Sequence, residues 1–100
     1  MVVFMSSFGL SLATRETGRD AYLQISDAMK NPDTLVTFDF TDVITVTNSF
    51  ADEVFGRLAM ELGMDELRKR TRFVNISPMW AKVIRGAMDQ RAAMRELVAS

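Results

Sequence analysis

Four short segments of the chain have the composition of β-strands. Residues 2–5, 34–40, 44–46 and 72–74 are rich in β-branched and aromatic side chains, which favour extended backbone. The longest of them, residues 34–40, is apolar at most positions, so we expect a strand that is buried on both faces of a sheet. Asp39 lies where this strand should stop.

A helical period separates the first two of these segments. Apolar side chains recur at spacings of three and four, which predicts a helix with one buried face, at Tyr22, Leu23, Ile25 and Met29. Ser11 and Thr14 are the two candidate N-caps. Gly18 lowers the helix propensity by about 1 kcal/mol relative to Ala, so we expect a close packing contact there. Residues 31–33, Asn-Pro-Asp, should end the helix because proline cannot continue it.

Two further helices are predicted in the second half of the chain. Ser49 opens the first, whose apolar residues recur every four positions (Phe50, Val54, Leu58 and Leu62), and Gly63 is a plausible terminator. Ser77 followed by Pro78 is a strong start signal for the second, whose apolar stripe contains Val83, Ile84, Ala87, Met88, Met94 and Val98. The basic run at residues 68–70 predicts a solvated connector. Strands and helices therefore alternate, which predicts one compact α/β domain with a mixed or parallel sheet.

Composition excludes several classes of function. Histidine and cysteine are both absent, which removes the commonest general base, the thiol nucleophile, disulfides and thiolate or imidazole metal sites. The net charge is −1, so there is no electrostatic reason to expect a nucleic acid or an anionic membrane as partner. No segment approaches membrane-spanning length, and the lack of cysteine is compatible with the cytoplasm.

One segment carries a family resemblance. Asp39-Phe40-x-x-Val43 followed by Ser49-Phe50-Ala51-Asp52-Glu53 resembles the STAS-like domains of unknown function, a variant of the STAS domains of anti-sigma-factor antagonists. The resemblance implies a small STAS-like α/β domain over residues 1–100, with a mixed or parallel β-sheet covered by about three helices. It also implies a non-enzymatic regulatory role through binding of another protein. The expected partner is a serine kinase or ATPase of the histidine-kinase-like fold, or a regulator containing one.

In STAS antagonists a serine at the start of a helix is phosphorylated by the partner kinase, and this serine falls at Ser49 here. The resemblance therefore makes Ser49 a candidate phosphoacceptor or partner contact. The expected binding face is the loop and helix of residues 45–55 with its rim, namely Asp42, Thr45, Thr47, Asn48, Phe50, Asp52, Glu53 and Arg57.

Ser49 also has a purely structural interpretation. Its hydroxyl is suited to cap the helix that follows, with Asp52 reaching back in a capping-box arrangement. Asp52 and Glu53 would stabilise the unmodified first turn, and they would repel an added phosphate. Both interpretations of Ser49 stay open at the level of sequence.

Acidic residues could instead be read as a magnesium site, formed by Asp39, Asp42, Asp52 and Glu53. We favour strand-end, turn and capping roles for them, and we expect neither a metal nor another cofactor. No activated nucleophile is evident, so an enzyme is not expected. The alternative function is a constitutive structural or assembly subunit that forms homo-oligomers, without a phospho-switch.

Overall fold

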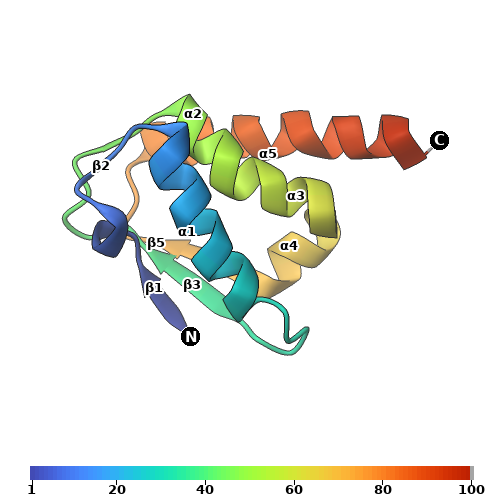
Figure 1. Ribbon diagram of the computed structural model, residues 1–100, viewed down its shortest axis with the longest axis horizontal. Helices are drawn as coiled ribbons and strands as arrows, with labels where there is room; N and C mark the ends of the chain where they lie inside the picture. Colours follow the sequence, from blue (N-terminus) through green and yellow to red (C-terminus); the bar gives the residue numbers. More distant parts are fainter. Residues whose placement is uncertain (100) are drawn as a thin grey trace.

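The computed structural model, which describes residues 1–99, contains a parallel three-stranded sheet (Figure 1). Its strands are β1 (Val2–Phe4), β3 (Val36–Asp39) and β5 (Thr71–Val74), in the order β1-β3-β5. Val3, Phe38 and Phe73 are aligned across the three strands. The predicted α/β class with a parallel sheet is therefore confirmed, and Asp39 is the last residue of β3, as expected.

A second, smaller parallel sheet joins β2 (Ser11–Leu12) to β4 (Thr45–Val46). A short 3-10 turn, η1 (Met5–Phe8), connects β1 to β2. The backbone N–H of Thr47 donates to the carbonyl of Leu12 at 3.0 Å. This pairing brings the segment after β4 next to the start of the first long helix.

That helix is α1 (Arg15–Ala28), and Thr14 is its N-cap, because its hydroxyl accepts a hydrogen bond from the N–H of Thr17 at 3.1 Å. After β4 the chain forms one continuous helical segment: α2 (Asn48–Ala51), the π-helix η2 (Asp52–Gly56) and α3 (Arg57–Leu62). It ends at Gly63, as predicted, where φ is +81°.

The basic run at residues 68–70 is not a connector, in contrast to the prediction. It forms the last turn of an additional helix, α4 (Met64–Arg70), which leads directly into β5. Arg70 is only 5% exposed, and its Nη2 donates to the carbonyls of Met29 and Asn31 at 2.6 and 2.8 Å. The guanidinium thus closes the carbonyl end of α1, which explains how a charged side chain is tolerated there.

Helices cover one face of the sheet only, so β3 is not buried on both faces as predicted. Val36 and Phe38 point into the core, where the ring of Phe38 lies 5.1 Å from that of Phe55 and 5.2 Å from that of Phe73. The alternate residues of the strand, Thr37 and Asp39, lie on the other face and are half-buried.

The final helix, α5 (Pro78–Ala99), begins as predicted, with the hydroxyl of Ser77 accepting from the N–H of Trp80 at 3.3 Å. Ile84 and Ala87 are buried against the rest of the fold. The last turns extend beyond the body of the molecule (Figure 1), so the predicted apolar stripe does not stay buried, and Met94, Leu97 and Val98 are exposed.

Candidate functional site

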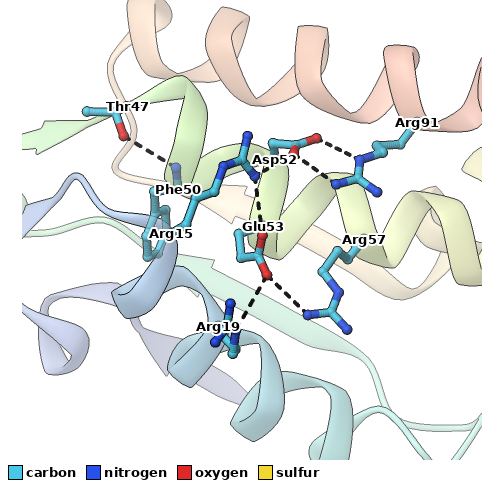
Figure 2. Close-up of polar contacts among 8 residues, drawn as sticks. All are labelled: Arg15, Arg19, Thr47, Phe50, Asp52, Glu53, Arg57 and Arg91. Atoms are coloured by element: carbon cyan, nitrogen blue, oxygen red, sulfur yellow. Dashed lines mark hydrogen bonds and ion pairs between the residues drawn. The ribbon is translucent and has the colours of Figure 1, made fainter.

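Thr47, and not Ser49, caps the helical segment that follows β4. Its hydroxyl accepts from the N–H of Phe50 at 3.3 Å (Figure 2), and it also donates to the carbonyl of Ala13 at 2.8 Å. The predicted capping role of Ser49 is therefore wrong, and so is the reach-back of Asp52, whose carboxylate is engaged elsewhere. The cap of this helix also ties it to the loop before α1.

Ser49 lies in the first turn of the helix and is half-buried, next to the exposed Asn48. Its hydroxyl makes no hydrogen bond with any of the residues that the structure describes. The Thr47 hydroxyl already accepts a hydrogen bond from an N–H group of the first turn, so the Ser49 hydroxyl is not needed as a cap.

Two carboxylates one turn further on are surrounded by arginines. The residues of this arginine–carboxylate cluster come from α1, η2, α3 and α5: Arg15, Arg19, Asp52, Glu53, Arg57 and Arg91 (Figure 2). Asp52, Glu53 and Arg57 were predicted as site residues, but Arg15, Arg19 and Arg91, which lie far from the two carboxylates along the chain, were not.

Asp52 is the most tightly held member of the cluster. Arg91 binds it in a bidentate manner, with Nε and Nη2 at 2.7 and 2.9 Å from Oδ1 and Oδ2. Arg15 donates to Asp52 Oδ2 at 2.8 Å. These hydrogen bonds, that from Arg91 above all, lower the pKa of Asp52 to about 2, against the effect of partial burial. Asp52 is therefore an anion at every physiological pH.

Glu53 is shared between three arginines. Arg15 Nη1 and Arg57 Nη1 each lie 3.2 Å from one of its carboxylate oxygens, and Arg19 Nε lies 4.0 Å away. The Arg57 guanidinium also stacks over the ring of Tyr22 at 3.9 Å, a cation–π contact between α3 and α1. Four guanidinium charges thus face two carboxylates, so the cluster as a whole carries a surplus of positive charge.

The π-helix η2 and two glycines make this close approach possible. A π-helical turn inserts one extra residue and redirects the side chains that follow, and such turns are frequent at functional sites. A Cβ atom at Gly18 would lie 2.9 Å from Glu53 Cβ, and one at Gly56 would lie 2.9 Å from Asp52 Oδ1. The predicted close contact at Gly18 is confirmed, whereas the π-helix was not predicted.

The other predicted contact residues differ in accessibility. Phe50 is fully buried, so its side chain cannot contact a partner in this fold, in contrast to the prediction. Thr45 is half-buried in β4, and Asp42 is exposed in a turn with φ of +69°.

Asp39 is not part of the arginine–carboxylate cluster that contains Asp52 and Glu53. Its carboxylate accepts hydrogen bonds from the hydroxyl and N–H of Thr41 at 2.7 and 2.9 Å and from Asn75 Nδ2 at 3.1 Å. These bonds, those from Thr41 first, lower the pKa of Asp39. Within residues 1–99, no three carboxylates are grouped as a metal site would require.

A family model described as "STAS-like domain of unknown function (DUF4325)" matches residues 19–80, which is more than half of the chain. The match runs from α1 to the first turn of α5 and includes Ser49, Asp52 and Glu53. No curated protein and no solved structure matches the chain. None of the helices described here is long and apolar enough to cross a membrane.

Proposed function

The chain belongs to the STAS-like domain family of unknown function, and on this premise we propose that it is a non-enzymatic regulatory module that binds another protein through the segment around Ser49. The observation that carries the proposal is the unused hydroxyl of Ser49. It lies in the first turn of a helix whose cap is already supplied by Thr47. A serine that is neither a cap nor a core residue is free for contact with a partner.

Phosphorylation of Ser49 is part of the proposal. A phosphate there would add a charge of about −1.5 to −2 three and four residues before Asp52 and Glu53, on the same side of the helix. Repulsion by these carboxylates is the physical objection. The surplus of guanidinium charge in the cluster offsets it, because Asp52 and Glu53 are already paired and Arg15 is still 53% exposed.

By resemblance to STAS antagonists, the proposed partner is a serine kinase or ATPase of the histidine-kinase-like fold, or a regulator containing one. The proposed contact surface consists of the accessible residues of the segment and its rim: Asp42, Thr45, Asn48, Ser49 and Arg57. Thr47 and Phe50 would support this surface from within.

A pull-down from native lysate with the wild type, Ser49→Asp and Ser7→Asp tests the proposal. Ser7 is exposed in η1, so Ser7→Asp adds the same charge away from the site. We expect a kinase-like ATPase to bind the wild type and Ser7→Asp but not Ser49→Asp. Equal capture by all three would refute control at Ser49, and capture of no partner would refute the binding module.

The second candidate is a constitutive assembly subunit, and the projecting end of α5 favours it. Met94, Leu97 and Val98 are 45%, 78% and 80% exposed on consecutive turns of this helix. Sedimentation at increasing concentration tests self-association, with Leu97→Glu as the variant that should abolish it. A wild type that stays monomeric at high concentration would refute this candidate.

A further inference from the structure

A groove of about 600 Å³ lies between α4, β5 and α5, among residues distinct from those around Ser49. Its large apolar lining residues are Met64, Leu67, Phe73, Ile84 and Met88. Leu67 and Ile84 are buried at its base, whereas Met64, Phe73 and Met88 are only partly buried. This volume is within the range of ordinary ligand sites, and the lining leaves apolar surface accessible at the edge of the core.

Three cations surround the groove without carboxylate partners. Arg68 on α4 and Lys82 and Arg85 on α5 line it and are exposed. No ion pair to any of the three is found among residues 1–99, even though Asp89 lies four residues after Arg85. The positive charge of these three side chains at the groove is therefore not compensated by an ion pair within the described residues.

Next to the groove, one edge of β5 is open. Within the described residues β5 pairs only with β3, at the end of the sheet. The N–H of Phe40 donates to the carbonyl of Val74 at 3.1 Å, which directs the backbone polar groups of Val74 toward β3. Because these groups alternate along a strand, those of Phe73 point toward the free edge. Phe73 thus offers backbone groups at the edge and an aromatic ring to the groove.

We propose that this groove binds an extended acidic segment of another protein, which adds as a strand beside β5. Apolar side chains on one face of the segment would fill the groove, and carboxylates on the segment would pair with Arg68, Lys82 and Arg85. Strand addition of this kind obtains affinity from main-chain hydrogen bonds and specificity from pockets for alternate side chains. A small amphiphilic anion would use the groove and the cations but not the strand edge, so the open edge favours a peptide.

Selection of peptides from a random 12-residue display library on the full chain tests the proposal. We expect the selected peptides to alternate Asp or Glu with Leu, Ile, Val or Phe. Their affinities are then measured by fluorescence anisotropy against Arg68→Glu and Lys69→Glu. Both substitutions reverse one exposed charge at neighbouring positions of α4, but Lys69 does not line the groove. We expect a loss of about tenfold or more for Arg68→Glu and of less than twofold for Lys69→Glu.

Two further measurements test whether a bound peptide pairs with β5 as an added strand. Peptide binding should shift the amide resonance of Phe73 and protect it from hydrogen exchange. N-methylation at alternate positions of the peptide should abolish binding. The proposal is overturned if the selected peptides show no acidic enrichment, or if the two charge reversals weaken binding equally. It is also overturned if only decanoate binds in the groove, or if sedimentation shows a dimer of the chain that Arg68→Glu dissociates.

Discussion

Replacing Asp52 by Asn tests the energetic role of the arginine–carboxylate cluster. The substitution keeps the shape of the side chain but removes the charge that Arg91 binds at 2.7 and 2.9 Å and Arg15 at 2.8 Å. Arg91 would then have no carboxylate partner, and Arg15 would retain only Glu53. Because these side chains join η2 to α1 and α5, the loss should destabilise the whole fold.

The pKa of Asp52 gives the magnitude of the stabilisation that this substitution would remove. It falls from 3.8 to about 2 in the folded state, which corresponds to about 2 kcal/mol of folding free energy. The folded pKa is below the unfolded one, so this stabilisation is complete above about pH 4 to 5 and is lost as the pH falls toward 2. Asp52 is only 15% exposed, so screening by solvent reduces the effect less than it does for surface pairs.

Urea denaturation followed by far-UV circular dichroism, at several pH values from 7 to 2, measures the effect. We expect Asp52→Asn to lower the free energy of unfolding at pH 7 by about 2 kcal/mol and to flatten its dependence on pH below 4. Asp27→Asn is the matched control, because the Asp27–Lys30 pair is 77% exposed on both sides, and it should cost less than about 0.5 kcal/mol. A loss of under about 0.5 kcal/mol for Asp52→Asn, or an unchanged pH dependence, would show that the cluster does not stabilise the fold in this way.

Three further predictions can be tested by the same denaturation assay. Thr47→Ala should cost about 1 kcal/mol because it removes the helix cap, whereas Ser49→Ala should cost less than about 0.5 kcal/mol; the reverse order would contradict the assignment of the cap. Arg70→Met should cost about 2 to 3 kcal/mol because it leaves the buried carbonyls it binds without a donor, and wild-type stability would disprove this role. Gly18→Ala should destabilise the fold by about 1 kcal/mol, because the added methyl group overpacks against Glu53. Gly86→Ala should instead stabilise the fold by about 1 kcal/mol, because Gly86 lies in open space on α5. Equal effects at the two glycines would contradict the close packing of α1 on η2.

Local patterns were sufficient for much of the fold. The strands at residues 36–39 and 71–74 follow from β-branched and aromatic runs, and the start of α5 follows from Ser77 and Pro78. Thr14 was one of two candidate caps for α1, and only the geometry decides between them. These features depend on residues close together in sequence, so composition and spacing are enough to predict them.

Features that depend on distant residues were missed. Asp52 is joined to Arg15 and Arg91 across 37 and 39 positions, a distance over which one sequence carries no pairing signal. The basic run ending at Arg70 resembled a solvated connector, although Leu67 and Arg70, three apart, are both buried on one side of α4. The helical spacing of these two residues, next to and within the basic run, was the signal in the sequence for α4. Serine is the better N-cap by residue type, so the role of Thr47 could be recognised only from the backbone.

We propose that Ser49 controls the binding of a partner. The most direct test of this proposal is the affinity of the captured kinase-like partner for the chain with and without phosphoserine genetically encoded at position 49. We predict that phosphorylation weakens binding at least tenfold, whereas phosphoserine at position 7 changes it less than twofold. Affinities within twofold of each other for the two forms at position 49 would contradict the claim.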